Sequence, residues 1–196
     1  MDIAGSPLAS EGLFAHFCAR FAELTPLVDL HAEPGTPEVL ARGSTLTMAL
    51  PVRGHVQLRV EQMTPTSATL VTLMGHPLAG AIRFLSERRG DLLRFEVQVY
   101  DRPANLADWL AMRTVGEGVE ASAWESLVLA MADESAGTSI APVQHEESYL
   151  DEDQAARIEA WVRELVAERK RGEHRASAAA QPAATGRESE GIAATL

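Results

Sequence analysis

Residues 54–61 (GHVQLRVE) and 91–100 (DLLRFEVQVY) decide the fold class, because hydrophobic and polar side chains alternate along both of them. In the first stretch the hydrophobic positions are Val56, Leu58 and Val60. A repeat of two is typical of a β-strand that buries one face of a sheet and exposes the other. Both stretches are therefore predicted to be strands, with their polar side chains on a solvated face.

Neighbouring stretches extend this prediction into a sheet. Residues 44–50, 67–74 and 79–86 also favour strand, and the segments between these stretches are short and rich in turn-forming glycine and proline. Parallel strands need long crossover connections, so strands this close together are expected to form an antiparallel meander. A further short strand is expected at residues 27–31, before a proline-rich loop.

Hydrophobic residues recur at helical spacing on both sides of the meander. Before it, residues 11–24 form a predicted helix with Ser10 as its N-cap. The Thr25-Pro26 step is expected to end this helix, because the residue before a proline avoids helical angles. After the meander, helices are expected at residues 105–113, 120–133 and 151–171.

The chain is thus expected to be an α+β protein with one core. Its 196 residues, 46% of them hydrophobic, can build a single domain of ordinary size, which we place at residues 1–135. Residues 136–150 are interpreted as a linker, and residues 151–171 as an additional amphipathic helix. Residues 172–196 lack any run that could bury apolar surface, so they are predicted to be a disordered tail.

Charge and cysteine content exclude several classes of partner and site. The net charge of -11, from 28 acidic and 17 basic residues, argues against nucleic acid and against anionic membrane surfaces. No apolar run is long enough to span a bilayer, and no secretory signal is visible, so a cytoplasmic location is expected. The single cysteine, Cys18, lies among phenylalanines and is interpreted as a buried structural residue. Neither a metal nor a cofactor is expected, because no ligand spacing or nucleotide motif is present.

Three features together point to a known family. A helix leads into Leu24-Thr25-Pro26-Leu27, a loop precedes Gly43-Ser44-Thr45-Leu46 and the meander, and a late amphipathic helix follows. Over residues 11–133 this pattern resembles the helix-grip superfamily, also called START-like, polyketide-cyclase-like or SRPBCC. Three further motifs are similar to those of an uncharacterised bacterial branch: Gly75-His76-Pro77 with Gly80, Arg83-Phe84, and Arg102-Pro103-Ala104.

The resemblance implies a curved antiparallel sheet wrapped around a long C-terminal helix, with an apolar cavity between them. Members of the superfamily bind lipids, sterols or polyketides, and a few catalyse cyclisation or dehydration, so the fold alone does not choose a function. The chain departs from the branch at Leu78, Ala79 and Ala81, which stand where acidic residues are common. No first strand is visible ahead of residue 11, and the helix at 151–171 lies outside the shared pattern.

The favoured hypothesis is a non-catalytic binding module for a hydrophobic small molecule or a lipid. Burial of apolar surface, at about 25 cal/mol per Å², would drive binding between the sheet and the helix at 120–133. The residues expected to line this cavity are Leu58, Val71, Ile82, Phe84, Phe95, Val97 and Trp124.

Two alternatives remain open. A cyclase-like or dehydratase-like enzyme would use His76 as a general base or Arg102 as an anchor for a carbonyl or anionic group. The competing interpretations are a turn histidine and an arginine in a structural salt bridge. An interaction protein would instead have a filled core, and it would form a homodimer or bind a partner through the Trp161 stripe of the helix at 151–171.

Overall fold

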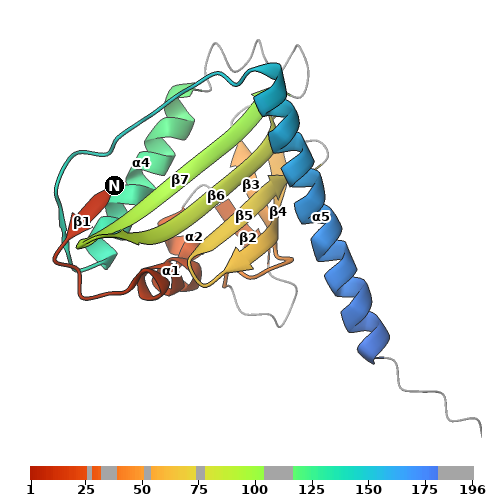
Figure 1. Ribbon diagram of the computed structural model, residues 1–196, viewed down its shortest axis with the longest axis horizontal. Helices are drawn as coiled ribbons and strands as arrows, with labels where there is room; N and C mark the ends of the chain where they lie inside the picture. The colour runs from red at the N-terminus through yellow and green to blue at the C-terminus, as the bar shows by residue number, and fades with distance from the viewer. Residues whose placement is uncertain (26–27, 32–38, 51–53, 74–77, 104–116, 181–196) are drawn as a thin grey trace, which may run out of the picture.

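The computed structural model describes residues 1–25, 28–31, 39–50, 54–73, 78–103 and 117–180. These residues form an α+β fold around one open, curved, antiparallel sheet (Figure 1). The strands follow the order β2-β3-β4-β5-β6-β7-β1-β8, so the meander from β2 to β7 is unbroken and the N-terminal strand adds to its end. The antiparallel meander expected from the alternating sequence is confirmed.

All the strands expected from the sequence are present. Their ends lie within three residues of the expected ends, and several strands are longer than expected. β6 and β7 pair along their full length, from Arg89↔Leu92 at the turn to Leu78↔Pro103 at the far end. The strands are β1 (Asp2–Ala4), β2 (Val28–His31), β3 (Thr45–Leu50), β4 (Gly54–Thr64), β5 (Ser67–Thr72), β6 (Leu78–Arg89), β7 (Leu92–Pro103) and β8 (Thr138–Ser139).

Three helices pack on the concave face of the sheet. These are α1 (Ser10–Ala19), α2 (Phe21–Leu24) and α4 (Glu117–Glu134), with α1 against β6 and α4 against β7. The expected helix at 11–24 is therefore divided at Arg20, and its N-cap is Ala9 rather than Ser10. Its end at the Thr25-Pro26 step is confirmed, because the Thr25 hydroxyl donates to the Phe21 carbonyl and caps the turn.

The core lies between the concave face and these helices, and phenylalanines form its centre. Phe17 of α1 stacks against Phe84 of β6 and Phe95 of β7, with ring centroids 4.9 and 5.3 Å apart. All three rings are fully buried, and Leu127 and Met131 of α4 pack against the same cluster. The apolar stripe expected on the helix at 120–133 thus faces the sheet.

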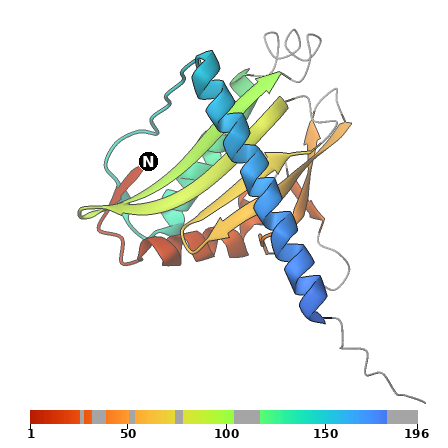
Figure 2. The ribbon, with the colours of Figure 1, turned by 45° about the vertical axis from the view of Figure 1, so that its right-hand side comes forward.

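The helix α5 (Glu152–Ala180) crosses the opposite, convex face of the sheet as a diagonal rod (Figures 1 and 2). Trp161 packs on Tyr100 of β7, with ring centroids 5.9 Å apart, and further along the helix Leu165 is buried. α5 then reaches β4, and its C-terminal end projects beyond the sheet. The convex face, which the alternation assigned to solvent, is therefore partly covered.

Two sequence expectations need correction. A strand, β1, does precede residue 11. It has only three residues and one buried hydrophobic side chain, Ile3, so it is too short to show an alternating pattern in the sequence. The last helix does not end at residue 171 but continues through Gly172 to Ala180. A helical glycine costs only about 1 kcal/mol relative to alanine, and the alanine-rich sequence that follows offsets it. The remainder of the expected tail, 181–196, and the expected helix at 105–113 lie outside the described residues.

Candidate functional site

The structure brings together most of the side chains expected to line a cavity. Leu58, Ile82, Phe84 and Phe95 lie in the buried cluster on the concave face. Val97 and Trp124 are partly buried against the same cluster, and the Trp124 ring packs on Phe84 at 5.7 Å. Among the described residues, the space over Phe84 and Phe95 is filled by the rings of α1.

Val71 is the exception, because it faces the other side of the sheet. It lies opposite Ala81 in the β5–β6 pair, whereas its neighbour Leu70 lies opposite Ile82 and belongs to the concave cluster. Val71 is nevertheless buried, on the face that α5 crosses. An apolar residue in an alternating strand can thus belong to a second interface on the other face of the sheet, and the sequence alone does not reveal that interface.

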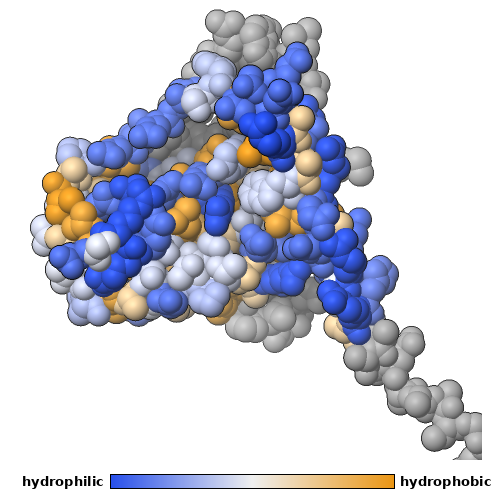
Figure 3. Space-filling view, in the orientation of Figure 1, coloured by the Kyte–Doolittle hydropathy of each residue, from blue (hydrophilic) through white to orange (hydrophobic). Residues whose placement is uncertain are grey.

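A groove opens where the filled core ends, between the outer edge of β7 and α4 (Figure 3). Its volume is about 90 Å³. Apolar and polar residues both line it: valine and aromatic side chains lie beside carboxylate, amide and imidazole groups. The lining residues are Met1, Phe95, Glu96, Val97, Trp124, Glu125, Val128, Val143, Gln144 and His145.

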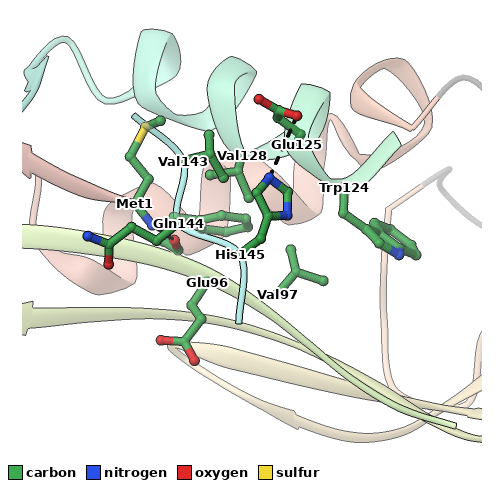
Figure 4. Close-up of a pocket in the computed structure, with 10 residues that line it drawn as sticks. Met1, Glu96, Val97, Trp124, Glu125, Val128, Val143, Gln144 and His145 are labelled. Atoms are coloured by element: carbon green, nitrogen blue, oxygen red, sulfur yellow. Dashed lines mark hydrogen bonds and ion pairs between the residues drawn. The ribbon is translucent and has the colours of Figure 1, made fainter. Parts of the chain in front are cut away.

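The groove is bounded on its outer side by an extended segment, residues 141–150, which we call the strap. It has no helix or strand, and most of its side chains are exposed. Val143 packs against the core cluster, and the His145 imidazole lies 3.6 Å from the Glu125 carboxylate (Figure 4). The strap is part of the linker expected at 136–150, whose first residues form β8 beside β1.

Gly137 sets the position from which the strap departs. A Cβ atom at this residue would lie 2.5 Å from Cγ2 of Ile3 and 2.8 Å from the carbonyl oxygen of Ala4. Only glycine lets the backbone approach β1 this closely. β8 can therefore pair with β1, and the strap leaves it running in the direction of β7 (Figure 1).

The polar residues of the groove differ in where their charges point. Glu125 faces His145 across the groove, whereas the Glu96 side chain points away from α4 to the convex side of the sheet (Figure 4). There the Glu96 carboxylate accepts a hydrogen bond from Gln98 at 2.7 Å and lies 3.9 Å from the Arg94 guanidinium. Arg94 itself is bound to both carboxylate oxygens of Asp2. The groove therefore receives no lysine or arginine side chain from its lining residues.

Of the two weak catalytic candidates, the structure describes only Arg102. Arg102 is an exposed residue whose guanidinium lies 2.7 Å from the Glu159 carboxylate of α5. Arg102 thus takes part in a salt bridge, with a partner on α5. His76 lies outside the described residues.

A buried ion pair ties α5 to the convex face. Glu61 lies at a β-bulge, where the β4–β5 register shifts between Val60 and Gln62, and its carboxylate binds Arg169. Their side chains are only 2% and 6% exposed. Arg169 also donates to Glu173 at 2.6 Å. Burial opposes the charge of Arg169, but the hydrogen bonds to Glu173 and Glu61 outweigh it and raise the pKa of the guanidinium.

Burial changes the acidity of two groups near the core. It raises the pKa of the Cys18 thiol to about 11, so this cysteine is a structural residue and a poor nucleophile. It also lowers the pKa of the Met1 ammonium group, which donates a 2.8 Å hydrogen bond to the Phe95 carbonyl beside the groove.

Comparison with known proteins leaves the family open. The chain matches no protein-family model and no curated protein. In the part of the chain that the structure describes, no cluster of three or more His, Cys, Asp or Glu side chains could hold a metal ion. Within the same ranges, no helix is long and apolar enough to cross a membrane.

Sequence reasoning missed the strap side of the groove. Val143 and His145 lie in a segment without periodicity, so nothing in the sequence places them over β7 and α4. Val128 was expected only as part of the apolar stripe of its helix. The one available signal was Gly137, since a glycine after a predicted helix is typical of a turn.

Proposed function

We propose that this chain is a non-catalytic binding module and that the groove between β7 and α4 takes an apolar group of a small molecule. The observation that carries the proposal is the groove lining: Phe95, Val97, Val128 and Val143 meet there beside Trp124. Small-molecule sites are typically concave and apolar, with a few polar groups at the rim. The α+β architecture is compatible with the helix-grip superfamily, and membership in it remains part of this proposal.

The size of the groove limits what it holds. Drug-sized ligands occupy about 300–1,000 Å³, and a dry cavity of about 150 Å³ accepts a benzene ring. A groove of about 90 Å³ therefore suits a short alkyl group or the end of a longer molecule. The rest of a lipid-sized ligand would have to lie outside it.

The test uses 1-butanol as an uncharged alkyl probe, followed by NMR of the valine methyl groups. Selective, saturable shifts are expected at Val97, Val128 and Val143, and not at Val99, which is 38% exposed outside the groove lining. Native mass spectrometry of the purified protein checks in parallel for a co-purified apolar molecule. Unselective shifts, together with no co-purified molecule, would refute the proposal.

A pair of variants adds a matched control. Val128→Phe fills the groove and is expected to abolish the butanol shifts, whereas Leu129→Phe places the same ring at the next residue of α4, which is 47% exposed. If overpacking unfolds the first variant, Val143→Phe brings the same bulk from the strap, at a residue that is only partly buried against the core. Retained butanol shifts in the folded Val128→Phe or Val143→Phe protein would contradict the groove as the site.

A further inference from the structure

The outer edge of β7 offers unpaired backbone groups next to the groove. The Phe95 N–H donates to the Met1 carbonyl, and the Phe95 carbonyl accepts from the Met1 ammonium. Residues of an antiparallel strand alternate between its two neighbours, so Val97 and Val99 also direct their N–H and C=O groups to this outer side. β1 pairs with β7 at Leu93 and Arg94, Met1 bonds to Phe95, and among the described residues nothing hydrogen-bonds to the outer edge of β7 beyond Phe95.

We propose that this edge, at Val97 and Val99, binds an extended peptide as an added β-strand, with one apolar side chain of the peptide in the groove. The proposal rests on the proposed function, because it assigns the apolar group in the groove to a peptide. Strand addition to an open edge is a common mode of recognition: the backbone gives affinity and pockets for alternate side chains give specificity. The peptide would continue the line of β1, which already pairs with β7 at Ile3↔Leu93.

The two sides of the edge define the kind of peptide. Side chains on the concave side would meet Val97, Trp124 and Val128, which line the groove. Those on the convex side would lie beside Glu96, whose side chain is 30% exposed. On β7 itself, the arginines of this side, Arg94 and Arg102, are engaged with Asp2 and Glu159. Together with the net charge of -11, this arrangement fits a peptide that alternates apolar and basic residues.

Two further features leave the edge accessible. Natural sheets protect edges with lysine, inward charges, bulges or covering segments, and no bulge interrupts the pairing of β6 with β7. The strap bounds the groove beside this edge, and its anchors are the packing of Val143 and the His145–Glu125 pair, whose side chains are 53% and 48% exposed. An ion pair that exposed stabilises little, so the His145–Glu125 contact offers little resistance to a peptide that enters beside the strap.

The probe is a seven-residue peptide of alternating lysine and valine, acetylated and amidated, which is titrated into the tagless protein by calorimetry. Hydrogen exchange of the free protein is expected to be slow at Gln98 and Tyr100, which pair with β6, and fast at Val97 and Val99. At a peptide concentration ten times its Kd, exchange at Val97 and Val99 should slow about tenfold. An edge already protected in the monomer would overturn the proposal.

Backbone methylation of the probe distinguishes strand addition from side-chain binding. Two peptides carry N-methyl groups at alternate residues in opposite phase, so that one blocks the amides facing β7 and the other blocks the amides facing solvent. One phase is expected to bind and the other to lose at least tenfold in affinity. Equal binding of both phases would refute strand addition, and so would tighter binding of a peptide with glutamate in place of lysine.

A protein variant provides the matching control. Val99→Pro removes an outward N–H without removing a bond to β6, a substitution that edge strands tolerate, and it is expected to weaken the peptide at least tenfold. Val99→Thr keeps the N–H and should bind like the natural chain. If Val99→Pro proves unfolded, the two methylated peptides decide the question alone.

Two other outcomes have defined meanings. Concentration-dependent protection of Val97 and Val99 without peptide, lost in Val99→Pro, would assign the edge to a second copy of the chain and overturn the peptide proposal. Butanol shifts in the groove without peptide binding would overturn this inference alone, whereas failure of the butanol test leaves no pocket for the peptide side chain and refutes both.

Discussion

Replacing Arg169 by methionine is expected to destabilise the protein by about 3–5 kcal/mol. The change removes the guanidinium that binds the Glu61 carboxylate, whose side chain is 2% exposed. Breaking a buried ion pair from one side costs this much, because it leaves a charge that neither water nor a partner compensates. The Glu61 side chain makes no other ion pair or hydrogen bond among the described residues.

The assay is urea unfolding followed by circular dichroism. Lys170→Met is the matched control, because Lys170 is the next residue of α5 and is exposed, so its loss should change stability by less than about 0.5 kcal/mol. With a slope of about 2 kcal/mol per M urea, the midpoint of Arg169→Met should fall by about 2 M. Equal midpoints for the two variants would refute the importance of the buried pair.

A double variant separates charge from packing. Glu61→Leu combined with Arg169→Met replaces the pair by apolar side chains, which is commonly neutral or stabilising. It should recover most of the loss seen in Arg169→Met. A double variant as unstable as the single one would show that the loss comes from packing of the long arginine side chain.

Two further predictions concern titratable groups. The hydrogen bond from Arg94 lowers the pKa of Asp2 below its usual 3.8, so the stability that this pair contributes is present above about pH 4 and is lost as the pH falls through the lowered value. Hydrogen exchange of the Phe95 amide should therefore accelerate below pH 4. Asp2→Asn should remove that acceleration. The same acceleration in Asp2→Asn would contradict the role of the Asp2–Arg94 pair. Burial raises the pKa of Cys18 from 9.0 to about 11, so at pH 8 its thiolate is about a hundredfold scarcer and alkylation should be at least that much slower than in urea. Similar alkylation rates in both states would show that the thiol is accessible.

The sheet was predictable because each strand of the meander carries its own signal. Val56, Leu58 and Val60 alternate with polar residues without help from the rest of the chain, and the short connections allow only antiparallel neighbours. α4 was predictable for the same reason, since its apolar stripe repeats at helical spacing.

The rest depends on contacts between distant residues. The partner of Arg169 is more than a hundred positions earlier in the chain, in a bulge that no local pattern reveals. For the same reason, the sequence shows that Val71 is apolar but not that a helix covers its face. The groove also escaped prediction, because three of its ten lining residues come from the aperiodic strap.

The pairing of Met1 with Phe95 has a practical consequence for handling the protein. Because β1 runs antiparallel to β7, any residues fused ahead of Met1 would leave it pointing along Val97 and Val99. A purification tag at that end could thus pair with the outer edge of β7 as a tethered strand, at millimolar local concentration, and block that edge. Removing such a tag by proteolysis before the measurement avoids this artefact.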